Sequence, residues 1–297
     1  MTLALAAGSV NAEEPVVTFT AAPDGVPLCV AEGGNPQGPP LVLIHGYSQS
    51  HAVFARQFDS ELAQTYRLIA PDLRGHGCSG KPWEESAYAG ARPWADDIAA
   101  VLSARRVARP VLMGWSAGGY WIVDYIREHG TQDLAGVVFT GSHGGLMSSR
   151  INPAIPALSR QMRDVNLAYP PDLAHALQWA EQFLPRMSAS PLPEDIQRIM
   201  YADTFMLPAY ARRAMAKRSM DNADLTSRMN LPLLLIYGEQ DRTATPEQLQ
   251  ALLAELPQAE LLTYAQTGHS TFAEQPDRFN QDLARFAQRV RAGQPPR

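Results

Sequence analysis

The stretch "PVLMGWSAGGYW", residues 110–121, decides the fold because it places a serine between glycines at the end of an apolar run. The apolar letters suit a strand that is buried on both faces. The continuation, "AGGYWIVDYIREHG", is typical of a helix that ends at Gly130. Ser116 is therefore expected in the turn between a buried strand and a helix. Gly114 and Gly118 flank it where a larger side chain would clash.

This G-x-S-x-G pattern between a strand and a helix is typical of a nucleophile elbow. Such a sharp turn strains the backbone of the serine and exposes its hydroxyl, while the helix N-terminus directs free N–H groups toward the same point. A Gly/Ser connection without chemistry would match the same five letters by chance. The strand before and the helix after favour the elbow, so we predict that Ser116 is a nucleophile.

A serine hydroxyl needs a base, and the base needs an orienting acid. The chain order Ser…Asp…His of this motif directs the search to later strands. After "LPLLLIYG" come Glu239 and Asp241, and after "LLTYAQTG" comes His269. Catalytic groups in open α/β sheets collect at such carboxyl ends. We predict His269 as the base and Asp241, which lies further into its loop than Glu239, as the acid. Asp124 is interpreted as a helix-surface acid.

The rest of the chain alternates short β-like runs with longer helical ones from residue 16 onward. "VVTFT" and "LCVAEGG" flank Asp24-Gly25, a hairpin turn signal. Alternating strands and helices predict an α/β fold with a mostly parallel central sheet and helices on both faces. Between residues 146 and 228 prolines separate short helical pieces, and no clear strand appears. We predict a core over residues 15–145 and 229–297 and an inserted helical cap over residues 146–228.

Two further patterns lie near the ends of the chain. "TFAEQPDRFNQDLARFAQRV" near the C-terminus predicts one amphipathic helix. "MTLALAAGSVNAEEP" combines a short apolar run with a small-x-small pattern but lacks basic residues. We interpret residues 1–14 either as a truncated secretory signal or as a disordered tail. The location of the protein, secreted or periplasmic against cytoplasmic, stays open.

Composition narrows the function classes. The 297 residues carry a net charge of −5, which disfavours binding to nucleic acid or anionic lipid. No apolar run is long enough to span a bilayer. Cys29 and Cys78 are too few for a zinc cluster or a disulfide framework. We predict two free thiols, and a pairing stays open for an oxidising compartment.

Four segments in order, "LVLIHGYSQS", "APDLRGHGCSG", "GWSAGG" and "GEQD…GHSTFAEQPDRFNQDLARF", resemble the α/β-hydrolase superfamily in its single-domain form with a helical cap. The resemblance covers about residues 16–145 and 229–290. It implies that the residue after His45-Gly46, Tyr47, donates a backbone N–H to an oxyanion hole, with Ser48 as the weaker alternative. Ala117 is implied as the second donor.

The resemblance also assigns supporting roles. The loop over residues 72–77 is similar to the D-x-R-G-x-G loop of the family, which we interpret as structural support. Four further histidines are interpreted as non-catalytic, namely His45, His51, His76 and His143. For His51 and His143, a place in the lining of the pocket is the alternative. Trp115 is expected in the core.

The function implied is a serine hydrolase that cleaves carboxylic esters or lactones through an acyl-enzyme. Hydrolysis of a carbon–carbon bond and cofactor-free perhydrolysis use the same triad and remain alternatives. A non-catalytic small-molecule binding protein on this fold is the alternative from another class. No nicotinamide, flavin or metal fingerprint appears, so no cofactor is predicted. The cap is expected to offer apolar side chains to an apolar portion of the substrate, namely Trp179, Phe183, Tyr201, Phe205 and Met206.

Overall fold

The computed structural model describes residues 14–148, 150–151, 170 and 172–294. The predictions for residues 1–13, and those for residues 152–169 of the expected cap, lie outside the described residues. Among the helices that the structure describes, none is long and apolar enough to cross a membrane.

An eight-stranded sheet forms the centre of the molecule, in the order β1-β2-β4-β3-β5-β6-β7-β8. β2 pairs antiparallel with β1 and with β4, and the other neighbours are parallel. The strand bounds are β1 Val16–Ala21, β2 Pro27–Gly34, β3 Pro40–Ile44, β4 Arg67–Pro71, β5 Val111–Trp115, β6 Gly136–Thr140, β7 Leu233–Gly238 and β8 Ala259–Tyr264. This arrangement confirms the predicted fold and the predicted hairpin.

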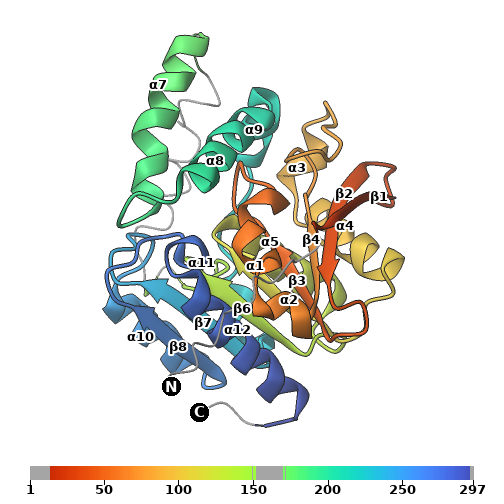
Figure 1. Ribbon diagram of the computed structural model, residues 1–297, viewed down its shortest axis with the longest axis vertical. Helices are drawn as coiled ribbons and strands as arrows, with labels where there is room; N and C mark the ends of the chain where they lie inside the picture. The colour runs from red at the N-terminus through yellow and green to blue at the C-terminus, as the bar shows by residue number, and fades with distance from the viewer. Residues whose placement is uncertain (1–13, 149, 152–169, 171, 295–297) are drawn as a thin grey trace, which may run out of the picture.

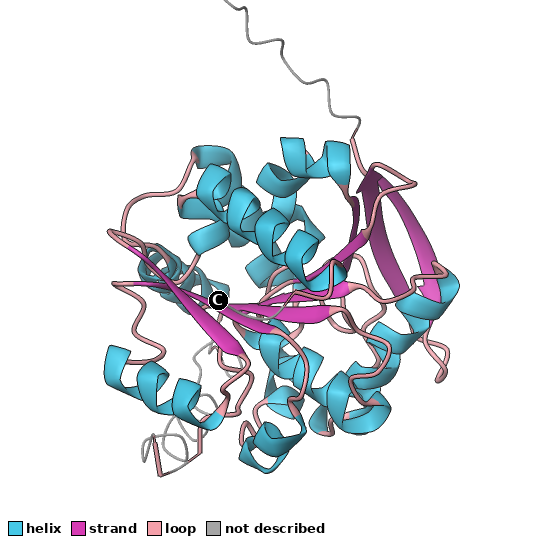
Figure 2. Ribbon diagram, turned by 90° about the horizontal axis from the view of Figure 1, so that it is seen from below, coloured by secondary structure: helices cyan, strands magenta, loops and turns pink. Residues whose placement is uncertain are grey.

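Helices cover both faces of the sheet, as Figure 2 shows with the sheet seen near its edge. The helix bounds are α1 Ala55–Phe58, α2 Glu61–Thr65, α3 Ser86–Ala89, α4 Arg92–Ala104, α5 Ala117–His129, α7 Leu173–Phe183, α8 Glu194–Met206, α9 Ala209–Met215, α10 Pro246–Glu255, α11 Thr271–Glu274 and α12 Pro276–Arg291. The described residues also form short 3₁₀ helices, with the bounds η1 His51–Phe54, η2 Leu184–Met187 and η3 Ala223–Arg228. The described residues between β6 and β7 form helices and no strand, and α7, α8 and α9 stand above the sheet in Figure 1.

The core consists of two hydrophobic clusters, one on each face. Helices α4, α5 and α10 pack on one face, and α1, α2, α11 and α12 pack on the other. β5 contributes to both, because Leu112 lies in the first cluster and Met113 in the second. Side chains along a strand alternate between the faces, so a strand covered on both sides must be apolar throughout. Trp115 is buried in the second cluster, as expected.

The C-terminal helical segment is interrupted, so the prediction of one continuous helix was wrong. α11 ends at Glu274 and α12 begins at Pro276. Gln275 between them has φ −130° and ψ 63°, outside the helical region. The ring of a proline clashes with a helical residue before it, which explains the break. α12 remains amphipathic and buries Phe279, Leu283 and Phe286 against the sheet.

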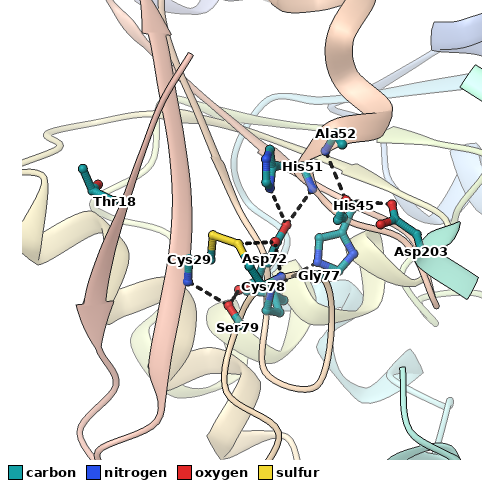
Figure 3. The surroundings of a disulfide bond; sticks show 12 residues. Thr18, Cys29, His45, His51, Ala52, Asp72, Gly77, Cys78, Ser79 and Asp203 are labelled. Atoms are coloured by element: carbon teal, nitrogen blue, oxygen red, sulfur yellow. Dashed lines mark hydrogen bonds and ion pairs between the residues drawn. A yellow bond between two sulfur atoms is a disulfide. The ribbon is translucent and has the colours of Figure 1, made fainter. Parts of the chain in front are cut away.

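Cys29 and Cys78 form a disulfide, which overturns the prediction of free thiols (Figure 3). Their Cα atoms lie 5.6 Å apart although 49 positions separate them in sequence. Cys29 lies on β2, and Cys78 lies in the loop after β4. Because β2 pairs with β4, the sheet brings the two cysteines together. No local sequence pattern predicts this disulfide.

The loop over residues 72–77 is a structural support, as the resemblance implied. The carboxylate of Asp72 accepts the backbone N–H of His51 at 2.6 Å and that of Cys78 at 2.9 Å (Figure 3). The guanidinium of Arg74 is buried and pairs with Asp97 at 2.6 Å. These bonds tie the loop to η1, to the disulfide and to α4.

Candidate active site

The nucleophile candidate Ser116 lies between β5 and α5 in a strained conformation. Its φ is 53° and its ψ is −116°, in a region that non-glycine residues rarely adopt. Its backbone N–H donates to the carbonyl of Thr140 at 3.0 Å, which ties the turn to β6. The conformation is that of the elbow that the glycine spacing predicts.

The flanking glycines are required by close backbone contacts. A Cβ on Gly114 would lie 2.6 Å from the backbone of Gly118 and Gly119. A Cβ on Gly118 would lie 2.4 Å from the carbonyl oxygen of Ile44 on β3. α5 therefore begins so close to two strands that no side chain fits between them.

Asp241 and His269 form a hydrogen-bonded pair, with Oδ2 of the acid 3.0 Å from Nδ1 of the imidazole. Both residues are buried. Asp241 also accepts the backbone N–H of Thr243 at 2.9 Å and its hydroxyl at 2.8 Å. Burial raises the pKa of Asp241, but the imidazole and the Thr243 donors outweigh it and hold the pKa below the ordinary value. The ionised acid orients the ring so that Nε2 is the basic atom.

His269 is also held by the residue that precedes Ser116. Nε1–H of Trp115, the residue before Ser116, donates to the backbone carbonyl of His269 at 3.0 Å. A Cβ on Gly141 would come within 2.8 Å of His269 Nδ1, so the ring lies directly against the loop after β6. Ser116 and His269 thus converge on residues 140–141. Within the described part of the chain the Ser116 hydroxyl makes no hydrogen bond, and its contact with His269 stays a prediction.

The two implied oxyanion donors line one small pocket, of about 30 Å³. Tyr47 follows β3 and Ala117 begins α5, so the parallel neighbours β3 and β5 bring the two residues together. Arg212 of α9 holds the loop from the other side: Nη1 donates to the hydroxyl of Ser48 at 2.6 Å, and the guanidinium lies 5.4 Å from the centre of the Tyr47 ring.

The comparisons with known proteins agree with the observed fold. A model of the alpha/beta hydrolase family matches residues 41–282. The chain belongs to the alpha/beta hydrolase family.

Solved structures and a curated relative are similar over most of the chain. The structure of a putative aryl esterase from Burkholderia cenocepacia is 31% identical and covers 93% of this chain and 100% of its own, with a TM-score of 0.79. That of the esterase RhEst1 from Rhodococcus sp. ECU1013 is 29% identical, covers 92% and 99%, and has a TM-score of 0.76. The AB hydrolase superfamily protein YisY of Bacillus subtilis is 25% identical over 263 residues, 88% of this chain and 96% of the relative.

Six pocket residues of this alpha/beta hydrolase were missed by sequence reasoning. Besides Tyr47 and Ala117, the pocket is lined by Tyr120, Trp121, Met215, Ala216, Arg218 and Met220. Tyr120 lies on the first turn of α5, three residues past Ala117, and that spacing was an available signal. Met215, Arg218 and Met220 come from α9 and the segment after it, and nothing local indicates which way they face.

The five aromatic and methionine side chains expected to line the pocket belong to α7 and α8, where Tyr201 lines a separate cavity of about 670 Å³. All five are described residues, and none lines the pocket beside Ala117. Trp179 stacks on Phe183 within α7 at 4.3 Å between ring centres, and Tyr201 contacts Phe205 within α8 at 5.4 Å. Met206 is exposed. Apolar faces of helices are visible in a sequence, but the element that each face meets is decided by tertiary packing.

The other histidines and Asp124 have structural surroundings in this alpha/beta hydrolase. The backbone N–H of Leu73 donates to Nε2 of His45 at 3.1 Å, and His51 bonds Asp72 at 2.9 Å. Burial lowers the pKa of His143 to about 4, so its ring is neutral. Asp124 is buried rather than on the surface, which corrects the sequence-based interpretation. It lies on the face of α5 that packs inward, and a buried guanidinium compensates it.

Proposed function

We propose that this alpha/beta hydrolase cleaves carboxylic esters or lactones through an acyl-enzyme on Ser116. The observation that carries the proposal is the strained Ser116 at the mouth of β5, next to a buried Asp241–His269 pair anchored through Trp115. The names of the two similar solved esterases support the same class of substrate.

The reaction proceeds in two halves. Nε2 of His269 takes the proton of the Ser116 hydroxyl as the oxygen attacks the substrate carbonyl. The backbone N–H groups of Tyr47 and Ala117 stabilise the oxyanion, a contribution of about 3 kcal/mol per donor. His269 then protonates the departing alcohol. In the second half it activates a water molecule, which releases the acid and restores the serine.

The pocket walls offer apolar surface to the part of a substrate nearest the nucleophile. Trp121, Met215 and Met220 present apolar surface beside Ala117. Each Å² of apolar substrate surface that is buried there contributes about 25 cal/mol to the free energy of binding. Small to medium esters with an apolar portion are therefore the proposed substrates.

Covalent labelling tests the nucleophile directly. A fluorophosphonate probe followed by peptide mass spectrometry is expected to modify Ser116 and to leave the Ser116→Ala variant unlabelled. The exposed Ser103 of α4 provides the matched control, since Ser103→Ala should label like the unchanged protein. Absence of any adduct on Ser116 in folded protein would favour the non-catalytic binding protein instead.

A substrate panel separates the hydrolytic chemistries. p-Nitrophenyl esters of increasing chain length, a lactone, a diketone and a peroxide assay are run on the same preparation. We expect ester or lactone turnover that Ser116→Ala lowers by a factor on the order of 10⁴ or more with unchanged circular dichroism. Turnover of the diketone or the peroxide alone would replace the ester proposal with the corresponding alternative.

A further inference from the structure

The pocket beside Ala117 contains a buried cation that the proposed acyl transfer does not use. Arg218 is only 8% exposed, and it lines the same pocket as Tyr47 and Ala117. Burying a guanidinium is costly unless hydrogen-bond acceptors surround it. The hydrogen-bond partners of its nitrogens therefore indicate which kind of ligand the pocket binds.

One side of this guanidinium is fixed by Asp124. Nη2 of Arg218 lies 2.8 Å from Oδ1 of Asp124, whose side chain is 1% exposed. Asp124 belongs to α5, the helix that begins directly after Ser116. The ion pair therefore holds Arg218 at a constant position relative to the nucleophile and the oxyanion donors.

The other side is unpartnered. Nη1 of Arg218 is buried and has no hydrogen-bond acceptor among the described residues. The other walls of the pocket, Trp121, Met215 and Met220, offer no carboxylate. Arg218 lines the pocket, so a turn of its guanidinium about the Asp124 contact would present Nη1 to a ligand oxygen there.

A second buried guanidinium favours a negatively charged ligand oxygen. The N–H groups of Arg212 donate to the hydroxyl of Ser48 and to the carbonyls of Leu207 and Thr204. Among the described residues, no carboxylate lies within ion-pair distance of Arg212. Its charge acts from behind Tyr47, the wall of the pocket that carries an implied oxyanion donor.

From these contacts we propose that Arg218 binds a carboxylate of the substrate, so that the preferred substrates are esters that carry a free carboxylate, such as monoesters of dicarboxylic acids. The inference rests on the proposed esterase function and names its substrate class. Guanidinium–carboxylate hydrogen bonds are charge-assisted and stronger than bonds to neutral acceptors.

Matched substrates make the inference measurable. Monomethyl esters of succinate, glutarate and adipate are compared with their terminal amides, which have the same shape without the charge. Acetoxyacetate and its amide place the carboxylate on the alcohol side. We expect kcat/KM to favour the carboxylate over its amide by about tenfold or more at the chain length that reaches from the oxyanion donors to Arg218.

Arg218→Lys is the informative variant, because a lysine retains a cation for Asp124 and lacks the second nitrogen. It is expected to reduce the preference, which is the ratio of kcat/KM for the carboxylate ester to that for its amide-bearing counterpart, to about twofold. Arg127→Lys is the matched control, since Arg127 lies on the same helix as Asp124 and pairs with Asp224 on the surface. The control should keep the full preference.

The outcomes separate this inference from the proposed function. Ser116-dependent hydrolysis without any carboxylate preference, or a preference that survives Arg218→Lys, overturns the role of Arg218 and leaves the esterase proposal standing. If no ester is turned over, calorimetric titration of Ser116→Ala protein with monomethyl glutarate and its amide still decides the matter. Equal affinities would overturn the inference, whereas tighter carboxylate binding that Arg218→Lys removes would support it. Should Arg218→Lys fail to fold, the comparison of carboxylate and amide on the unchanged protein is decisive.

Discussion

The turn from β5 to α5 and the helices α7–α9 contribute to this molecule in opposite ways. In the turn, backbone atoms meet at distances that exclude any side chain, and Ser116 holds a conformation that little else would impose. In α7 and α8, the aromatic side chains expected over the active site pack on neighbours within their own helices. A site that depends on backbone sterics can be predicted from the sequence. A site that depends on how helices pack on one another cannot.

Replacing Asp241 tests the predicted active site near the turn, and it has the largest expected effect. Asp241→Asn keeps the shape of the side chain but favours the wrong tautomer of His269, so kcat should fall by about 10⁴. Steady-state hydrolysis of p-nitrophenyl acetate measures the loss. Glu239→Gln, at the exposed neighbour, is the control and should retain activity. A loss of activity in Glu239→Gln, with Asp241→Asn still active, would make Glu239 the better candidate.

A methyl group at Gly118 tests whether backbone contacts at the turn exclude a side chain. Gly118→Ala places a Cβ 2.4 Å from the carbonyl oxygen of Ile44, so we expect a loss of roughly 3 kcal/mol or more in the free energy of unfolding. Gly90→Ala is the control, because the nearest atom to its Cβ is 3.8 Å away. Urea unfolding followed by circular dichroism compares them. Equal stabilities would show that the turn is looser than its contacts indicate.

Reducing the disulfide tests a contact that neither helix pattern nor turn chemistry indicates. Opening the link between Cys29 and Cys78 should lower the free energy of unfolding by roughly 2–4 kcal/mol, because the unfolded chain gains freedom. Urea unfolding with and without a phosphine reductant measures the difference. The double variant Cys29→Ala/Cys78→Ala should not respond to reductant. A midpoint of the unchanged protein that ignores the reductant would contradict a stabilising link.

Substitution in α8 should have the smallest effect. Met206 is 44% exposed and does not line the pocket beside Ala117, so Met206→Ala should change stability by no more than about 0.5 kcal/mol. Met215→Ala, at a buried pocket position on α9, should cost about 2 kcal/mol or more and alter the chain-length preference of ester hydrolysis. A variant at Met206 that shifts this preference would restore the original expectation for α8.

Several elements were predictable because their signals are local. The apolar run of β5, the glycines around Ser116 and the strand ends before Asp241 and His269 each depend on few neighbouring residues. The break at Gln275 also had a local signal, since Pro276 follows it, and the prediction of one continuous helix gave that proline too little weight.

The sequence by itself indicated the parallel sheet, the strained turn at Ser116 and the strand ends that carry Asp241 and His269, because side-chain alternation and backbone sterics act between near neighbours. Only the tertiary structure decided that Cys29 meets Cys78, that Asp124 is buried against Arg218 and that α9 rather than α7 lines the pocket. Those contacts join residues far apart in the chain. They depend on which strands pair and which helix faces meet, and periodicity within one element carries no information about either.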